Sequence, residues 1–470
     1  MTKQELKQKL YERYIQPTEQ KNHTYVGIEI EMPIVNLSYN AVDFEVVHRL
    51  TSEFMKEFKF TAVGTDENGH IYSAVNKENN DVFSYDCSYN NAELSFGKEV
   101  CLNTIHERFL RYYRFINNFL SRYNHILTGM GINPYRKLNN NVPIENGRYK
   151  MLYNHLLSYP KYAVLPMHFH RYPNFGMFSS ASQVQLDVSK ENIIKVINTF
   201  NRLEPIKAVL FSNSILLGEN ENLMCSRDML WENSTHGINP HNVGMFDRDF
   251  ECLDEFLEYI ASTSIYCVER EGHYINFKPT PLYEYFNTES IIGEYSDNEK
   301  ISSLKFKPCA DDLYYLRTFK FEDLTFRGTI EFRSGCCQPI SDVMTISAFH
   351  LGLINRIDTL RNLLKADTVL YHNGYTAAEL RKLLIYKKLP GFVDENKLYE
   401  LITNILDLCK DGLSYRNFGE EAYLDPLYER VKTRLNPAKE MLYKLHNGTS
   451  ISSLISCYAD ENSVGVLSQV

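Results

Sequence analysis

The sequence predicts an α+β fold, with an antiparallel sheet in its first three hundred residues and a helical C-terminal part. Three observations support this expectation. Short segments alternate between apolar and polar residues, which is the period of a strand with one buried face. Longer segments repeat apolar residues every three or four positions, as an amphipathic helix does. Segments of the second kind make up most of the last third of the chain.

Eight segments have the helical period. The first of them places Val46, Leu50 and Phe54 on one side. The expected helices span residues 42–58, 100–125, 190–202, 250–264, 341–365, 376–388, 394–410 and 422–446. Ser341 is a residue type that commonly caps a helix N-terminus. We therefore expect a sheet-containing body in residues 1–340 and a helical extension packed on it in residues 341–470.

The composition excludes several classes of protein. Hydrophobic residues make up 44% of the 470 residues and charged residues 23%, which is typical of a globular protein. No segment approaches the roughly 18 apolar residues of a membrane span, and residues 1–14 are charged, without the apolar centre of a signal peptide. The net charge of -9 argues against a general nucleic-acid binder. We expect a cytoplasmic protein with no nucleic-acid or membrane partner.

Ten cysteines are scattered along the chain, and none forms a CxxC pair suited to zinc. In a reducing cytosol we expect free thiols. The adjacent Cys336 and Cys337 could regulate the protein by oxidation, but passive packing is the more common role of such a pair.

Two early strands carry acids on one face. Because strand side chains alternate, residues 24–32 (TYVGIEIEM) place Glu29 and Glu31 side by side, opposite an apolar stripe. Residues 91–97 (NAELSFG) repeat the arrangement with Glu93 on the polar side. Three carboxylates are thus available on strand faces, and Asp86 is close by in the sequence.

Two later strands extend the pattern. Residues 181–188 (ASQVQLDV) carry two amides and an acid on one face, namely Gln183, Gln185 and Asp187. Residues 325–333 (TFRGTIEFR) carry an acid and two guanidinium groups on one face, namely Arg327, Glu331 and Arg333. Amide and carboxylate oxygens bind hard cations, and guanidinium groups bind phosphate oxygens in pairs.

An isolated polar strand face is usually a face exposed to solvent. Four such strands with six acids, counting Asp86, two arginines and no lysine differ from ordinary exposed faces, which are rich in Thr, Lys and mixed charge. In a shared sheet the acids would repel unless divalent cations neutralised them, and oxygen ligands favour Mg²⁺ or Mn²⁺ over zinc. The arginines favour bound phosphate. The pattern therefore predicts a nucleotide held over a metal-lined sheet.

The sequence gives little support to other classes of nucleotide- or phosphate-binding site. The sequence contains neither a G-x-x-x-x-G-K-[ST] loop nor a G-x-G-x-x-G fingerprint, which argues against P-loop and Rossmann proteins. A two-metal phosphohydrolase would share acids and arginines, but such sites commonly use histidines and aspartates at strand ends. Here the acids are mainly glutamates within strands.

Over residues 25–335 the motifs resemble the glutamate–cysteine ligases of the plant and proteobacterial type, together with related bacterial carboxylate–amine ligases. Residues 27–31 (GIEIE) are similar to the family's G-[IV]-E-x-E strand, and residues 92–95 (AELS) to its E-L-S strand. Residues 182–187 (SQVQLD) are similar to T-x-Q-V-N-L-D. Three further matches follow in the same order: residues 211–214 (FSNS), 226–231 (SRDMLW) and 329–333 (TIEFR).

The resemblance implies a glutamine synthetase-like fold, in which an antiparallel sheet curves into a funnel with helices on its outer face. It also implies metal ligands, which are Glu29, Glu31, Glu93, Gln183 and Glu331. Arg227 and Arg333 are the implied catalytic groups, facing the ATP phosphates or an acyl phosphate. Gln185 and Arg327 share the same strand faces and are further candidates for nucleotide binding.

Two segments depart from the family. Residues 88–91 (SYNN) lack the glycines of the family's E-P-G-G-Q loop, so Asp86 is a weaker substrate candidate. Residues 166–171 (PMHFHR) replace a basic, Met-rich run, and His168 there is either a substrate group or structural. Both departures bear on which substrate is chosen rather than on the type of reaction.

The expected activity is ATP-dependent ligation of the γ-carboxylate of glutamate to the amine of cysteine through an acyl phosphate. The products would be γ-glutamylcysteine and ADP, as in glutathione biosynthesis, with ATP and two or three Mg²⁺ ions, or Mn²⁺ in their place. A related ligase that uses another amine, amino acid or carrier-bound acyl group is the alternative. A homologue that binds a ligand without catalysis is a third possibility, against which the intact acids and arginines argue.

Overall fold

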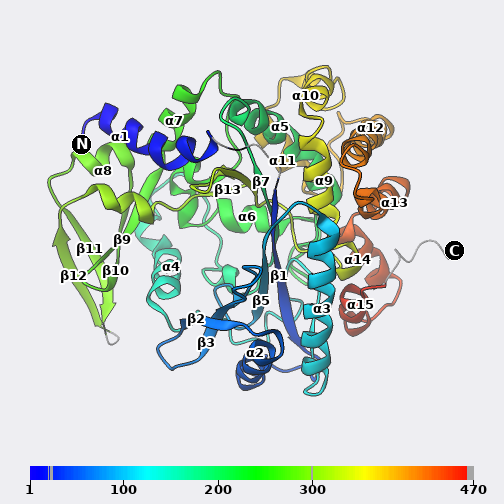
Figure 1. Ribbon diagram of the computed structural model, residues 1–470, viewed down its shortest axis with the longest axis horizontal. Coiled ribbons are helices and arrows are strands. Elements are labelled where there is room, and N and C mark those ends of the chain that lie inside the picture. The colour runs from blue at the N-terminus through cyan, green and yellow to red at the C-terminus, as the bar shows by residue number, and fades with distance from the viewer. Residues whose placement is uncertain (20, 22–24, 298–299, 463–470) are drawn as a thin grey trace.

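The computed structural model describes residues 1–19, 21, 25–297 and 300–462. Within these residues a nine-stranded antiparallel sheet forms the centre, in the order β14-β15-β7-β1-β5-β4-β3-β2, with β6 also paired to β1 (Figure 1). Its strands are β1 (Val26–Asn36), β2 (Thr61–Thr65), β3 (Ile71–Val75), β4 (Val82–Tyr85), β5 (Asn91–Glu99), β6 (His125–Leu127), β7 (Ser182–Asp187), β14 (Glu322–Leu324) and β15 (Thr329–Phe332). The predicted α+β class with an antiparallel sheet is confirmed.

The four strands with polar faces are neighbours in this sheet. β1 pairs with β5 on one side and with β7 on the other, and β15 follows β7. The register sets Glu31 opposite Glu93, and Glu29 opposite Gln183. Because side chains alternate across a strand, this register gathers their polar side chains on one face of the sheet.

The opposite, apolar face of the sheet is covered by helices. Val26, Ile28 and Ile30 of β1 are buried in the main core, which helices α2, α3, α5 and α9 also enter. These helices are α2 (Phe44–Phe58), α3 (Leu102–Ser121), α5 (Ile193–Phe211) and α9 (Thr345–Ile354). Asp43 caps α2 by accepting from the Glu45 N–H. The sheet therefore has one packed face and one face left for polar chemistry.

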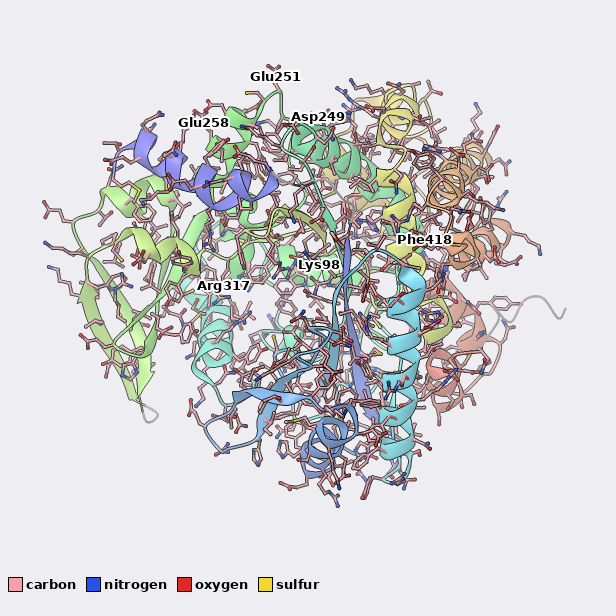
Figure 2. The ribbon with its side chains drawn as sticks, viewed as in Figure 1. Lys98, Asp249, Glu251, Glu258, Arg317 and Phe418 are labelled. Atoms are coloured by element: carbon pink, nitrogen blue, oxygen red, sulfur yellow. The ribbon has the colours of Figure 1, made fainter. Side chains whose placement is uncertain are left out.

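The C-terminal helices pack at one end of the molecule (Figure 1). They are α10 (Ile357–Lys365), α11 (Ala377–Leu384), α12 (Glu395–Ser414), α13 (Asp425–Thr433), α14 (Pro437–His446) and α15 (Ile451–Ala459). Glu420, fully buried, accepts from the Leu102 N–H at 2.8 Å and so caps α3 from a distant part of the chain. Figure 2 shows Phe418 beside the start of α3, where its carbonyl accepts from Asn103. Residues on both sides of the predicted boundary at residue 341 belong to the same core, and the division into a body and a helical extension stays a prediction.

Three predicted helix boundaries were wrong. The segment 341–365 forms two helices, because the chain turns at Asn355 and Arg356 between α9 and α10. The segment 422–446 likewise breaks at Asn436, whose side chain caps α14 ahead of Pro437. α5 continues to Phe211 instead of ending near residue 202, since its second half is buried on all sides and loses the amphipathic period.

A smaller antiparallel sheet lies at the other end of the molecule (Figure 1). Its strands are β9 (Ser264–Arg270), β10 (His273–Pro281), β11 (Ile291–Asp297) and β12 (Lys300–Phe306). Arg317 lies between this sheet and the centre of the molecule (Figure 2). The remaining elements are α1 (Lys3–Leu10), α4 (Gly147–Leu157), α6 (Ser226–Glu232), α7 (Leu253–Ser262), α8 (Leu282–Asn287), β8 (Val243–Gly244) and β13 (Phe319–Lys320), the last two paired in parallel.

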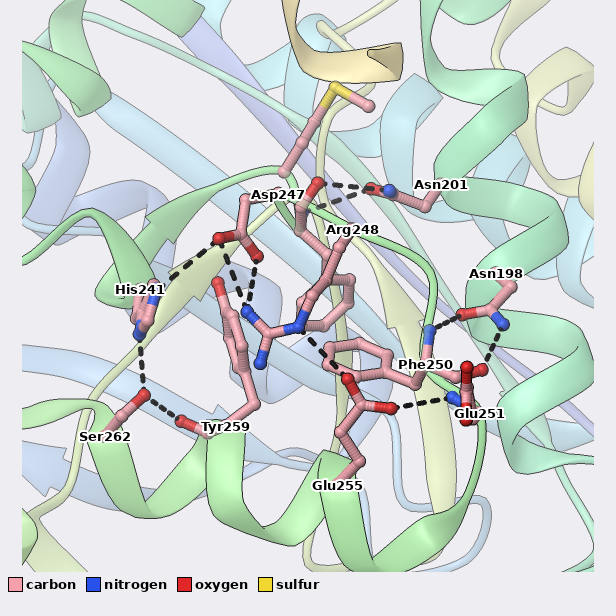
Figure 3. A network of polar contacts seen from close by, with 12 residues as sticks. Asn198, Asn201, His241, Asp247, Arg248, Phe250, Glu251, Glu255, Tyr259 and Ser262 are labelled. Carbon is pink, nitrogen blue, oxygen red and sulfur yellow. Dashed lines mark hydrogen bonds and ion pairs between the residues drawn. The ribbon is translucent and has the colours of Figure 1, made fainter.

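α7 is linked to α5 by the loop that precedes it. Asn198 and Asn201 are one turn apart on α5 and each exchanges two hydrogen bonds with the loop backbone (Figure 3). Their partners are the backbones of Phe250 and Phe246, at 2.7–3.1 Å.

Among the described helices, none is long and apolar enough to cross a membrane.

Candidate active site

Glu31 lies at the centre of the polar face. It is 6% exposed and accepts from the Ala181 N–H at 2.7 Å and from the Gln183 side-chain N–H at 2.8 Å. Gln183 Oε1 is buried without a hydrogen-bond partner. Glu93, opposite Glu31 on β5, accepts from the Ser95 hydroxyl. The carboxylates of β1 and β5 thus share one side of the sheet, as the alternation predicted.

Gln185 links three strands through its side-chain amide. Its N–H donates to Glu29 at 3.0 Å and to Glu331 at 2.8 Å. Its oxygen accepts from Arg327 Nε at 3.1 Å and from the Thr329 hydroxyl at 3.2 Å. The amide therefore holds the acids of β1 and β15 at either side of β7.

The two arginines of the β15 segment differ in their surroundings. Arg333 is half-buried and pairs with Glu331, which is 6% exposed. Arg327 is exposed and reaches Glu331 only at 3.8 Å. Burial lowers the pKa of Arg333, but the charge of Glu331 and the other acids outweighs it and raises the pKa overall. Arg333 therefore stays a fixed positive charge beside the acids.

The acids hold their protons more tightly than free glutamates do. Burial raises the pKa of Glu31 to about 8, and the charge of Asp86 adds to the effect. Burial also raises the pKa of Glu29 to about 7, with a further contribution from Glu331. The pKa of Glu93 is raised well above its usual range by burial and by its neighbouring acids. Raised pKa values of this kind indicate that nearby positive charges do not neutralise the cluster when its acids ionise.

Asp86 joins this cluster from the turn between β4 and β5. Burial raises its pKa, while the opposing charge of Arg148 lowers it. Arg148 lies in the first turn of α4, which is anchored on β4 by the Tyr149 hydroxyl donating to the Tyr85 carbonyl at 3.2 Å. Arg148 is not among the residues predicted from the sequence, because α4 lacks a clear apolar period. Asn146, which caps α4, is the one local signal that precedes it.

Arg227 is held at the start of α6. Its Nη1 donates to the Gly335 carbonyl at 3.1 Å, and its backbone N–H donates to the Ser214 hydroxyl at 3.2 Å. Its Nε is buried without a partner. The motifs at 211–214 and 226–231 thus meet in space, and the nearby charge of Glu31 contributes to the raised pKa of Arg227.

Some predicted residues lie apart from the cluster. His168 is exposed on the segment before β7, and within the described residues no contact joins it to the strand acids. Its neighbour His170 is structural, since its Nε2 donates to the Leu230 carbonyl at 2.6 Å. Asp187 pairs with Lys21 at 2.5 Å. Cys336 packs with its sulfur 3.6 Å from that of Cys225, in the buried layer behind Arg227.

The donor set suits a hard cation. Its candidate ligands are oxygens of Glu29, Glu31, Glu93, Glu331 and Gln183, and the Gln183 oxygen is buried without a hydrogen-bond partner. In the described residues, three His, Cys, Asp or Glu ligand atoms come within 4.8 Å of one another only at Glu45, His48 and His70. On the polar face the Gln185 amide lies between Glu29 and Glu331, and it donates to both carboxylates.

A shallow groove between α2 and α3 is unrelated to this chemistry. It is lined by Arg49, Ser52, Glu53, Phe115, Asn118, Phe119, Arg122 and Tyr123. None of these is a predicted site residue, so the polar face of the central sheet remains the candidate site.

Comparison with known proteins gives a consistent result. The sequence matches no established family profile. It is 25% identical over 329 residues to a chloroplastic glutamate–cysteine ligase of Solanum lycopersicum, and 23% identical over 327 residues to that of Arabidopsis thaliana. Each match covers 68% of this chain, which spans 57% of the length of each relative.

The fold is also that of a solved structure. A Francisella tularensis glutamate–cysteine ligase in complex with AMP superposes with a TM-score of 0.51 and 12% identity, covering 96% of this chain and 91% of its own. The predicted resemblance is therefore confirmed: the chain is similar in sequence to plant glutamate–cysteine ligases and shares its fold with a bacterial one.

Proposed function

We propose that this protein is an ATP-dependent carbon–nitrogen ligase that joins the γ-carboxylate of glutamate to the amine of cysteine. The observation that carries the proposal is that Arg333 lies on the same sheet face as Glu29 and Glu31, two carboxyl groups with raised pKa values, and pairs with Glu331 there. Such a face could bind a nucleoside triphosphate together with divalent cations. The similarity to glutamate–cysteine ligases supports the same reaction.

Mg²⁺ is the proposed metal, in two or three sites, with Mn²⁺ as a substitute. Its ligands would be Glu29, Glu31, Glu93, Gln183 and Glu331. When bound, Mg²⁺ would offset the negative charge on phosphate oxygens. The chain's own part is to hold these oxygens in place, since Gln183 and Gln185 fix the carboxylates by their amide N–H groups.

The arginines would bind the transferring phosphoryl group. The carboxylate oxygen of the substrate attacks the γ-phosphorus of ATP and releases ADP. The amine then attacks the acyl carbon, phosphate leaves with the bonding electron pair, and the amine loses a proton. Arg227, with its unpartnered Nε, and Arg333 would stabilise the phosphate charge in both steps. Gln185 and Arg327 would contact the nucleotide.

Asp86 and Arg148 are suited to an amino-acid substrate. They are opposite charges on facing elements, one beside β4 and the other at the start of α4. Asp86 would bind an ammonium group and Arg148 a carboxylate. His168 remains a prediction as a substrate residue, because it is exposed on a separate segment.

A second candidate keeps the chemistry and changes the amine or the acyl donor, which could be carrier-bound. The observation that favours it is the loop after Asp86, where the family's glycines are replaced by side chains. Asn90 donates to the Asn140 carbonyl at 3.0 Å, and Asn91 to the Ser179 carbonyl at 3.3 Å. These asparagines occupy space that glycines would leave open for a substrate.

Purified protein with ATP and Mg²⁺ tests both proposals through ADP release and mass spectrometry of the product. Glutamate with cysteine should give ADP and γ-glutamylcysteine together, and omitting either amino acid should stop both. Product with a different amine would support the second candidate. ATP hydrolysis that needs no amine would indicate a phosphohydrolase, and no turnover with any pair would leave a ligand-binding homologue.

A further inference from the structure

We propose that Glu45, His48 and His70 form a metal site of a different class, away from the strand acids, which binds a borderline transition ion such as Zn²⁺. One ligand atom of each of these side chains lies within 4.8 Å of the other two. Two imidazoles and a carboxylate are ligands that Zn²⁺ takes readily, whereas Mg²⁺ prefers oxygen alone. The site is therefore chemically separate from the polar face of the central sheet.

Local structure brings the three side chains together. α2 begins after Asp43, and its first two turns contain Glu45 and His48, which are three residues apart and therefore neighbours on the helix surface. His70 comes from the turn between β2 and β3. Asp66 Oδ1 fixes that turn by accepting from the backbone N–H groups of Asn68 and His70 at 2.9 and 2.8 Å.

The His48 side chain is an unsatisfied polar group. Both of its ring nitrogens are buried and neither makes a hydrogen bond. Its ring stacks on that of His70, with centroids 3.8 Å apart and planes 12° from parallel. A neutral imidazole keeps a free lone pair on one ring nitrogen, which can bind a metal ion. A bound ion would supply the partner that the protein does not.

His70 is oriented as metal-binding histidines commonly are. Asp66 Oδ2 lies 3.4 Å from its Nδ1, and the Tyr89 hydroxyl donates to the same oxygen at 2.9 Å. A carboxylate on one ring nitrogen fixes the tautomer and leaves the other nitrogen for an ion. Tyr89 also packs its ring against the His48 ring, at 4.6 Å between centroids.

The ion would cross-link side chains from two different elements of the fold. Glu45 and His48 belong to α2, and His70 to the β2–β3 turn. The supporting Tyr89 belongs to the loop that follows Asp86. Binding should therefore stabilise this corner of the sheet independently of any catalytic activity.

Equilibrium dialysis with Zn²⁺ tests the proposal on the full chain without a histidine tag. Excess Mg²⁺ is present to occupy sites made of oxygen ligands alone. Wild type should bind one equivalent at micromolar Zn²⁺. His70→Ala and Glu45→Gln, both at accessible positions, should bind at least ten-fold more weakly. His446→Ala, which removes an exposed histidine at the end of α14, should bind as wild type does.

Thermal unfolding provides a second readout. Zn²⁺ should raise the Tm of wild type and of His446→Ala but not that of His70→Ala. Equal Zn²⁺ binding in wild type and His70→Ala, or no binding by wild type at these concentrations, would overturn the proposal. Because neither measurement uses ATP or an amino acid, failure here says nothing against the ligase function.

Discussion

Gln183 donates its side-chain N–H to Glu31 across the β1–β7 pair at 2.8 Å, which leaves the Gln183 oxygen buried without a partner. The hydrogen bond fixes which end of the amide faces the carboxylate. An unpartnered buried acceptor costs free energy unless water or an ion satisfies it. This pair therefore points to a cation on the polar face, in agreement with the raised pKa values around it.

Stability of the metal-free protein should fall as the pH rises. The pKa of Glu31 is raised from 4.5 to about 8 and that of Glu29 to about 7, so the folded state binds these protons more tightly than the unfolded state. Their contribution to stability is present below about pH 4.5 and is lost as the pH rises toward 8. Thermal unfolding in EDTA at a series of pH values should show Tm decreasing over this range.

Mg²⁺ should counteract this loss of stability at high pH, because it binds the ionised carboxylates and not the protonated ones. We expect 10 mM Mg²⁺ to raise Tm more at pH 8 than at pH 6. Glu31→Gln is the control, since an amide does not titrate and its EDTA profile should be flatter. A Glu31→Gln profile as steep as that of wild type would show that the dependence arises elsewhere.

The sequence alone was enough to assign the polar face but not the distances on it. Alternation in residues 27–31 correctly grouped Glu29 with Glu31, because strand periodicity is local. The bridging role of Gln185 depends on the order of β1, β7 and β15, which no local pattern encodes. Arg148 was missed for a related reason, since it reaches the site from a helix without a clear apolar face.

Arg333→Lys should lower kcat strongly while changing stability little. Lysine keeps the positive charge beside Glu331 but loses the planar pair of donors that binds phosphate oxygens. We expect a loss of about 100-fold or more in kcat, in the range seen when a transition-state donor is removed. Arg327→Lys, at the exposed neighbouring position, should lose less. Equal losses in the two variants would argue against a specific phosphate contact for Arg333.

Arg381→Ala should destabilise the protein by about 3–5 kcal/mol, because it leaves the buried Asp228 carboxylate without its cation, whereas Glu204 keeps Lys207. Arg381 pairs with Glu204 at 2.6 Å and with Asp228 at 2.7 Å, and all three side chains are buried. Asp228 is the residue after Arg227, so the loss should also disturb α6. Urea unfolding measures the change in free energy of unfolding.

Lys382→Ala is the matched control for Arg381. Lys382 is adjacent in the chain and exposed, and it pairs with Glu232 at 3.0 Å. A surface pair contributes about 0–1 kcal/mol, so this variant should unfold nearly as wild type does. A small effect at Arg381 as well would mean that water replaces the lost guanidinium.

Helix boundaries were harder to predict where burial is complete on all sides. The second half of α5 contains Glu204 and Lys207, which look like solvent-facing residues in the sequence. Both are buried and paired with each other. Pro205 also lies within this helix although proline usually breaks one, so the sequence pattern did not predict that the helix continues past residue 202.

Gly352→Ala should destabilise the contact between α9 and α12. A Cβ at Gly352 would lie 2.4 Å from the Cys409 carbonyl oxygen, and one at Gly412 would lie 2.0 Å from the Gly352 carbonyl oxygen. The two helix backbones therefore meet at a spacing that only glycine permits. The added methyl group forces them apart, and overpacking of this kind costs about 1–3 kcal/mol.

Gly391→Ala separates this steric effect from the general effect of replacing glycine. Nothing lies within 4 Å of a Cβ at Gly391, and its backbone is not in the left-handed region. Alanine there should leave stability unchanged or raise it by about 0.4–1 kcal/mol, because it restricts the unfolded chain. Urea unfolding should therefore show a loss of stability for Gly352→Ala and no loss for Gly391→Ala. If Gly352→Ala proves as stable as Gly391→Ala, the helices are free to move apart at no cost, and the close α9–α12 contact does not limit the stability of the C-terminal part.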